Sequence, residues 1–524
     1  MIHRLYQTLF LGALISTTAF DANAELGVAS LFSDHAVLQR DMPVPIWGSA
    51  DAGEEVTVAF REQTKSTKAD KDGKWRLKLD ALETGGPDEL SISCGDEKIA
   101  IADVLVGEVW VGSGQSNMAG GAGGYAKRDA TLAKLLEAAP YPKIRLMKGG
   151  AKPIWQEADA KSAPGFSAIL LAYGESLHRE LDVPVGLIVG AVGGTPSGAW
   201  LSQAAYDSSD ACKKSLAEFS NKFDADGAQK AYEAKLAAWE KRVAEAQAKG
   251  EKPKGRKPGP PAKPGQMTRG GVGNLYEKFI RSVVGYGIRG VLWDQGESGT
   301  AIIGVDQYSV MDALISGWRK EWGQGEFPFI YVQKPSGGGP ASSPKGENQI
   351  TREADPYQPP PASVPKVGDG ARRLEFIRIM DIPNAHMVSA ADLGSSVHPT
   401  NKWGYGNRAA RVAFAKVYGK DLLSHGPRYK SHKLEGDKIR IEFSNVGGGL
   451  AQVGGEALTG FAIAGEDKNF VWADAVIDGE DVVLSAEAVS KPVAVRFACS
   501  KKRNWANLFN KDGLPALAFR TDKW

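Results

Sequence analysis

A serine and a histidine occupy sequence settings suited to nucleophilic hydrolysis. Ser116 lies in the segment GSGQSNM at 112–118, directly after a largely apolar run, and the glycines there permit a sharp turn and close approach of a substrate. His398 lies in DLGSSVHP at 392–399, after a second apolar run. A serine hydroxyl becomes a nucleophile when a neighbouring base takes its proton. We therefore expect Ser116 to be the nucleophile and His398 the general base.

Two further segments carry groups suited to stabilising an oxyanion. The segment GGTP at 193–196 follows the apolar run 185–189, and its backbone N–H groups suit an oxyanion hole. The segment WDQGES at 293–298 contains Gln295, whose amide can donate a hydrogen bond to developing negative charge. Glu297 in the same segment can accept a hydrogen bond from a sugar hydroxyl or from His398. Each segment alone is typical of an ordinary turn, and only their occurrence together predicts a site.

The sequence leaves open which group orients His398. A general-base imidazole works best when its second ring nitrogen is hydrogen-bonded. Asp392 is our first expectation, because Gly394 permits a tight turn between it and the histidine. Glu297 is the second candidate, and a backbone carbonyl, which would leave a Ser–His dyad, is the third.

The elements that precede these segments alternate between apolar strands and helices, a pattern that predicts a parallel α/β sheet. The expected strands span 104–111, 185–189, 290–293, 327–332 and 385–390, and the expected helices span 170–181, 307–322 and 402–418. In an open parallel sheet, binding sites form at the carboxyl ends of the strands. All four chemical segments follow such ends, so we expect them to meet.

The rest of the chain divides around this α/β unit. Residues 25–106 contain short alternating runs separated by turn signals, which predicts a small β sandwich, and residues 424–524 predict a second β domain. The α/β catalytic domain then spans 107–423, with insertions at 203–271 and 335–371. Residues 1–24 combine Arg4, an apolar run and a small-x-small cleavage site, as in a secretory signal.

Composition excludes several other classes of protein. The 524 residues include 64 Lys+Arg and 62 Asp+Glu, so the net charge of +2 gives no reason to expect nucleic acid as a partner. Three cysteines cannot form a disulfide scaffold, and no Cys or His spacing predicts a metal site. We expect a periplasmic or secreted protein with no stable membrane insertion once the signal is removed.

The motifs together resemble the sialate O-acetylesterase family, within the SGNH hydrolases. The resemblance rests on GQSNM at 114–118, GGTP at 193–196, QGES at 295–298 and the His398-Pro399 pair, supported by LFSDHAVLQRDMPVPIWG at 31–48, FSAILLAYGESL at 166–177, FPFIYVQ at 327–333 and NLFNKDGLPALAFRTD at 507–522. It implies a flavodoxin-like SGNH hydrolase core, with a parallel sheet in an α/β/α arrangement, flanked by N- and C-terminal β modules. It also implies that the Ser116 amide, Gly194 and Gln295 form the oxyanion hole, and that no metal or cofactor takes part.

Two positions depart from the family pattern. Many SGNH hydrolases have Asp three residues before the histidine, where this chain has Ser395, and this family often has Glu two residues before Trp200, where this chain has Gly198. The resemblance therefore predicts an exported carbohydrate O-acetylesterase acting on acetyl esters of sialic acid or a polysaccharide, without specifying the sugar. The alternative is a glycan-binding protein on an esterase scaffold. The sequence does not predict the oligomeric state.

Overall fold

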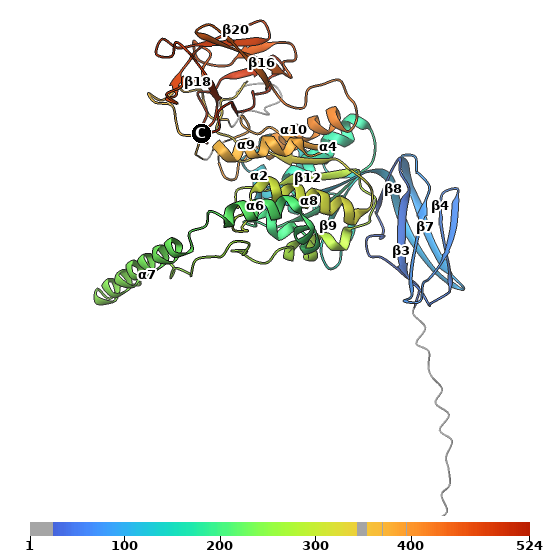
Figure 1. Cartoon of the computed structure of the whole chain (residues 1–524). Helices are drawn as coiled ribbons and strands as arrows, with labels where there is room; N and C mark the ends of the chain where they lie inside the picture. Colours follow the sequence, from blue (N-terminus) through green and yellow to red (C-terminus); the bar gives the residue numbers. More distant parts are fainter. Residues whose placement is uncertain (1–24, 343–353, 369, 395) are drawn as a thin grey trace, which may run out of the picture.

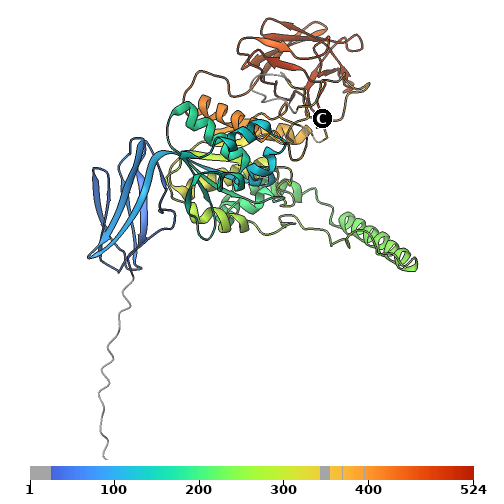
Figure 2. The ribbon, with the colours of Figure 1, turned by 180° about the vertical axis from the view of Figure 1, so that it is seen from behind.

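Three units follow one another along the chain: an N-terminal β module, a central α/β unit and a C-terminal β module (Figure 1). The computed structural model describes residues 25–342, 354–368, 370–394 and 396–524, so the expected signal at 1–24 lies outside the described residues. The two β modules lie on different sides of the central unit, as the view from behind also shows (Figure 2). Among the described residues, no helix combines the length and the hydropathy needed to span a bilayer.

The N-terminal module consists of two sheets that share one hydrophobic core. Alternation places Val56, Val58 and Phe60 of one sheet, and Trp75 and Leu79 of the other, in the same buried cluster. The strands pair as β1-β3-β6 in one sheet, and as β5-β4-β7-β8 with β2 beside β8 in the other. They are β1 (Gly27–Val28), β2 (Val37–Gln39), β3 (Val44–Ser49), β4 (Glu55–Phe60), β5 (Gln63–Lys68), β6 (Lys74–Leu79), β7 (Gly85–Cys94) and β8 (Glu97–Gly114).

Strand β8 belongs to two units at once. Residues 97–106 pair with β7 in the antiparallel sheet of the N-terminal module, and residues 108–114 pair with β11 and β12 in the central sheet. The expected domain boundary between residues 106 and 107 therefore falls inside one continuous strand. The N-terminal module is joined to the strand that leads to Ser116 without an intervening linker.

The central sheet has the strand order β10-β9-β11-β8-β12-β13-β14. All of its neighbouring strands are parallel except β10, which is antiparallel to β9 at the edge. The strands after β8 are β9 (Tyr141–Lys148), β10 (Trp155–Ala158), β11 (Val185–Ala191), β12 (Gly290–Asp294), β13 (Phe329–Val332) and β14 (Ala385–Val388). Their carboxyl ends therefore meet at one edge of the sheet.

Helices cover both faces of this sheet. In β12, Leu292 packs into the cluster that includes α4 and α10, whereas Val291 and Trp293 pack into the cluster that includes α8 and α9. This alternation is that of a strand buried on both faces. The helices are α1 (Ser116–Ala119), α2 (Ala122–Ala126), α3 (Ala130–Glu137), α4 (Ala168–Leu181), α5 (Gln203–Ser208), α6 (Asp210–Ser220), α7 (Ala225–Ala248), α8 (Gln307–Trp322), α9 (Gly370–Arg378) and α10 (Lys402–Lys416).

The first insertion forms an arm. Helix α7 projects away from the central unit (Figures 1 and 2), and none of its residues is buried. The ammonium of Lys257 lies 5.9 Å from the centre of the Trp239 ring, so the Lys/Pro/Gly-rich segment passes beside the helix. The second expected insertion, 335–371, is described only in part, because residues 343–353 and 369 lie outside the described ranges.

The C-terminal module has two four-stranded sheets, β15-β16-β21-β20 and β19-β18-β22-β24, and a short β17-β23 pair. Ile439, Phe461, Val482 and Val495 share its core. Its strands are β15 (Arg428–Glu435), β16 (Lys438–Ser444), β17 (Leu450–Gln452), β18 (Phe461–Ala464), β19 (Val471–Trp472), β20 (Asp474–Asp478), β21 (Asp481–Ser485), β22 (Ala494–Phe497), β23 (Leu508–Asn510) and β24 (Phe519–Arg520).

The requirement for glycine at position 114, the last residue of β8, can be tested by substitution. The φ of +130° at Gly114 favours glycine, and a Cβ there would overlap the carbonyl of Asp294 in β12. We expect Gly114→Ala to lower the free energy of unfolding by more than about 1 kcal/mol. Gly124→Ala in α2 is the matched control, because no atom lies within 4 Å of the added carbon. Thermal denaturation of both variants measures the difference. Equal stability of the two variants would contradict the conclusion that the conformation at Gly114 requires glycine.

Candidate active site

The carboxyl ends of four parallel strands bring the chemical segments together. Gly114 of β8 pairs with Ala191 of β11 on one side and with Asp294 of β12 on the other. Ser116 therefore emerges between the segments that contain Gly194 and Gln295. His398 arrives from the segment that follows β14.

The nucleophile and the base expected from the sequence are in contact. Ser116 Oγ lies 2.9 Å from His398 Nε2, within the hydrogen-bonding range that proton transfer requires. Ser116 begins the short helix α1 and is half-buried, whereas the imidazole is exposed. The pair is thus accessible from solvent.

The glycine segment after β11 lies beside the serine. A Cβ added at Gly193 would lie 3.5 Å from Ser116 Cβ, and Gly194 has a φ of +72° with open space around it. Within the described ranges, no hydrogen bond is recorded for the backbone N–H of Ser116 or of Gly194. Arg269, from the first insertion, donates to the Gly194 carbonyl at 2.6 Å and so holds this segment. The two N–H groups have the chemistry of an oxyanion hole.

Gln295 differs from its expected role. Its amide nitrogen donates to the carbonyls of Thr195 at 3.3 Å and Gly299 at 3.0 Å, so both of its N–H groups are already used. The side chain is fully buried and joins the segment after β11 to the segment after β12. The structure therefore corrects the expected direct donation to an oxyanion: Gln295 braces the glycine segment instead.

Asp392 also differs from its expected role. Its two carboxylate oxygens accept hydrogen bonds from the guanidinium of Arg408 in α10, at 3.2 and 3.0 Å, and its side chain is fully buried. The planar guanidinium matches a carboxylate in this two-point geometry. The expected Asp392–His398 contact is therefore wrong in this structure. Ser395, which stands at the usual position of the acid, lies outside the described residues.

Glu297, the second candidate to orient His398, points elsewhere. One carboxylate oxygen accepts from Gln115 at 2.6 Å, and the other lies 3.1 Å from Asn117 Nδ2 and 2.8 Å from Lys334 Nζ. Among the described residues, no carboxylate contacts His398. The geometry there is that of a Ser–His pair.

A buried ionic cluster lies directly behind the serine. Lys334 Nζ lies 2.6 Å from Asp294 and 2.8 Å from Glu297, and both Lys334 and Asp294 are fully buried. Burial raises the pKa of Asp294, with Lys334 opposing and Glu297 adding to the effect. Burial acts in the same direction on Glu297, but Lys334 outweighs it and holds the pKa of that carboxyl below its usual range. Glu297 is therefore a carboxylate near neutral pH.

Sequence reasoning missed three members of this site. Asn117 stood inside the GQSNM motif without a role, and Lys334 and Lys402 were not singled out. The available signal was a lysine two residues after the end of an apolar strand, at Lys334, and another in the first turn of a buried helix, at Lys402. A fully buried lysine requires compensating charges, which sequence spacing does not identify.

A cavity of about 340 Å³ adjoins the segment that carries His398, because Ser396 and Val397 line it, and its volume falls in the range of small-ligand pockets. The C-terminal module contributes Lys501 to its wall, so residues of the second and third units line it together. The lining residues are Glu297, Lys334, Pro335, Ser336, Gly368, Arg372, Ser396, Val397 and Lys501.

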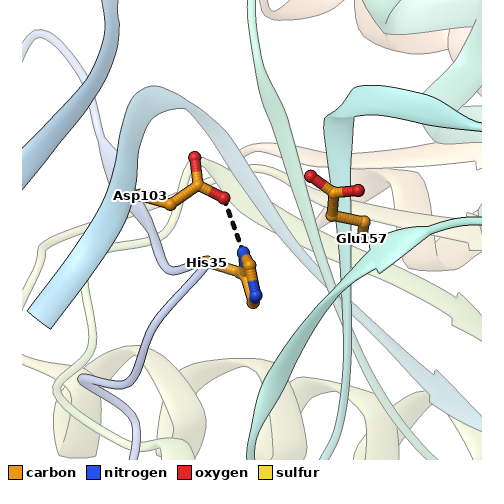
Figure 3. A group of neighbouring side chains, drawn as sticks. All are labelled: His35, Asp103 and Glu157. Carbon is orange, nitrogen blue, oxygen red and sulfur yellow. Dashed lines mark hydrogen bonds and ion pairs between the residues drawn. The ribbon is translucent and has the colours of Figure 1, made fainter.

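One group with metal-ligand spacing occurs in the part of the chain that the structure describes: His35, Asp103 and Glu157 (Figure 3). His35 Nδ1 lies 2.5 Å from Asp103, and Arg145 contacts Asp103 at 2.8 Å and Glu157 at 2.6 Å. Arg145 thus supplies the positive charge for both carboxylates. The group lies at the junction between the N-terminal module and the β9–β10 edge of the central sheet.

Comparisons with known proteins agree with the geometry. Residues 106–226 match the family described as "Carbohydrate esterase, sialic acid-specific acetylesterase". The chain is 29% identical over 466 residues to the sialate O-acetylesterase of Homo sapiens, covering 78% of this chain and 74% of that protein. It is 28% identical over 464 residues to that of Pongo abelii, with the same two coverages. A carbohydrate acetylesterase from Xanthomonas citri superposes with a TM-score of 0.72 at 27% identity, covering 95% of this chain and all of that one.

The position of Asp392 predicts a stability effect rather than a catalytic one. Removing one partner of a buried ion pair costs about 3–5 kcal/mol, and asparagine, which keeps one acceptor oxygen, should fall at the lower end. We expect Asp392→Asn to lower the midpoint of thermal unfolding while kcat of the folded enzyme stays within about tenfold of wild type. The exposed Asp421, changed to Asn, is the control. An unchanged midpoint with a kcat loss of about 10⁴-fold would instead place Asp392 on His398.

Proposed function

We propose a serine mechanism for this chain, which belongs to the sialate O-acetylesterase family and is an esterase. Ser116 attacks the carbonyl carbon of an acetyl ester, and His398 moves the proton. The observation that carries the proposal is the 2.9 Å separation of Ser116 Oγ and His398 Nε2. The cavity that Val397 helps to line lies beside this pair and offers room for the substrate.

The reaction follows from the positions of these groups. His398 Nε2 accepts the hydroxyl proton as Ser116 Oγ bonds to the carbonyl carbon. The negative charge then falls on the carbonyl oxygen, where the backbone N–H groups of Ser116 and Gly194 can receive it. His398 returns the proton to the alcohol oxygen as the ester bond breaks, which leaves an acetyl-enzyme. In the second half, His398 takes a proton from water as the water oxygen bonds to the acetyl carbonyl carbon. It then returns that proton to Ser116 Oγ as the bond to the serine breaks and acetate leaves.

We propose an O-acetylated carbohydrate as the substrate, either a sialic acid or a polysaccharide. The similarity to proteins named sialate O-acetylesterase and carbohydrate acetylesterase supports the class. The hydroxyls of Ser336 and Ser396 and the guanidinium of Arg372, all in the cavity lining, suit a ligand rich in hydroxyl groups. At Gly198 an added Cβ would lie 2.7 Å from the Thr300 carbonyl oxygen, so the glutamate that the family often has there would not fit. The sugar must therefore be recognised through other residues.

We propose that the central unit is a flavodoxin-like SGNH hydrolase core. Strands β11-β8-β12-β13-β14 are parallel, and numbered along the chain their order is 2-1-3-4-5, which is the order of flavodoxin-like sheets. Strands β9 and β10 extend the sheet beyond β11. The proposed site lies at the switch point next to β8, where such sheets bind ligands.

Export is also part of the proposal. It rests on the sequence of residues 1–24 alone, which combines a basic residue, an apolar run and the Ala22-Asn23-Ala24 cleavage site. The mature enzyme would then begin near Glu25 and act in the periplasm or outside the cell.

A glycan-binding protein that lacks catalysis is the second candidate. The observation favouring it is that, in the described ranges, no carboxylate contacts His398. The two candidates differ in a single measurement, acetate release.

We expect wild-type protein to release acetate from at least one of O-acetyl sialic acid, acetylated xylan and other acetylated polysaccharides. Ser116→Ala should remove this activity by several powers of ten, because triad lesions leave only about 10³–10⁴-fold catalysis over water. A serine-directed phosphonate should add to Ser116 of the wild type, as peptide mass spectrometry would detect. The exposed Ser208, changed to Ala, is the control. Binding of the same glycans without acetate release would favour the second candidate.

A further inference from the structure

The loop that carries His398 needs an anchor. Its imidazole is exposed, and among the described residues no carboxylate fixes it. The imidazole nevertheless lies 2.9 Å from Ser116 Oγ. Since an error of about 1 Å in the placement of a reacting group can cost 10²-fold in rate, some other contact must set this distance.

Asn117 makes that contact. Its side-chain nitrogen donates to the carbonyl oxygen of Val397 at 3.2 Å and to Glu297 at 3.1 Å. Asn117 directly follows the nucleophile, and Val397 directly precedes the base. The bond therefore joins the two catalytic segments one residue away from each reacting side chain.

Lys402 fixes the orientation of the Asn117 amide. Its ammonium donates to Asn117 Oδ1 at 2.5 Å, and both side chains are fully buried. An ammonium is only a donor and a carboxylate only an acceptor. The amide oxygen must therefore face Lys402, and the amide nitrogen must face Glu297 and Val397.

Glu297 is itself held in place, so Asn117 is fixed from two sides. Gln115 donates to Glu297 at 2.6 Å, and Lys334 lies 2.8 Å from it. Lys402 also lies 4.6 Å from the centre of the Tyr125 ring, a distance typical of a cation–π contact. Neither Asn117 nor Lys402 can turn without breaking buried contacts.

We propose that Asn117 and Lys402 are positioning residues that set the Ser116–His398 geometry, in place of a carboxylate on the imidazole. The inference rests on the proposed function. Lys402 orients the Asn117 amide, and Asn117 ties the His398 loop to the nucleophile. Neither residue contacts the reacting atoms, so both act through Ser116 and His398.

The test compares kcat with KM in two variants, Asn117→Asp and Lys402→Met. Asn117→Asp keeps the side-chain volume and an oxygen for Lys402, but it removes the donor to both Val397 and Glu297. Lys402→Met keeps most of the length and removes the donor to Asn117. We expect kcat to fall about 10- to 100-fold in both, with KM within about threefold of wild type. The rate of phosphonate addition to Ser116 should fall in parallel, because it depends on the same proton transfer.

Lys416→Met is the matched control, since Lys416 is exposed at the other end of α10. Near-ultraviolet circular dichroism checks that each variant is folded. Wild-type kcat and phosphonate addition in folded Asn117→Asp would overturn the inference, even if Lys402→Met does not fold. A 10- to 100-fold rise in KM with kcat unchanged would also overturn it. The proposed function fails separately, if Ser116→Ala keeps its activity.

Discussion

The hydrogen-bond register of β8 is the constraint on which the candidate active site depends. Gly114 pairs with Ala191 and with Asp294, so the three segments that follow β8, β11 and β12 begin at the same level. Within β8, Trp110 faces the α4 and α10 layer, while Val109 and Val111 face the α8 layer. A slip of one residue would exchange the two faces, which is why burial on both sides fixes the register. The same strand continues into the N-terminal module, which therefore contributes to holding the strand that leads to Ser116.

The strand register places Ser116 at the carboxyl edge of the central sheet, and buried charged groups hold the side chains around it. Asp294, Glu297, Lys334 and Lys402 place two negative and two positive groups behind the serine. Each unpaired ion would cost several kcal/mol in a medium of low dielectric constant, so the cluster is stable only when its members keep their partners. The neighbouring amides of Gln115 and Asn117 hydrogen-bond to members of this cluster, so their orientation depends on it as well. The compensated charges and the proposed catalytic residues are therefore parts of one hydrogen-bonded network.

Sequence reasoning could predict which segments meet, but not which side chains bond to one another. The apolar runs and the glycine turns located the strand ends, and the parallel pattern implied that Ser116, Gly194, Gln295 and His398 share one edge. The partner of Asp392 could not be found in this way, because Arg408 lies 16 residues away on α10 and faces the acid only when the helix packs on the sheet. The contacts of Gln295 could not be predicted for a related reason. Its amide donates to two backbone carbonyls, and the position of a backbone acceptor cannot be inferred from residue types.

The C-terminal module completes the cleft rather than standing apart from it. Arg373 of α9 donates to the carbonyls of Gly337 and Lys501, and the backbone N–H of Arg503 donates to Gly338. Burial and the nearby Arg503 lower the pKa of the Arg373 guanidinium to about 9. The groups that accept its hydrogen bonds and stabilise its positive charge are backbone carbonyls. These bonds join the segment after β13 to the C-terminal module at the wall of the cavity, where Lys501 lies. These hydrogen bonds hold the two units together, so the proposed substrate site is formed by the C-terminal module as well as by the α/β unit.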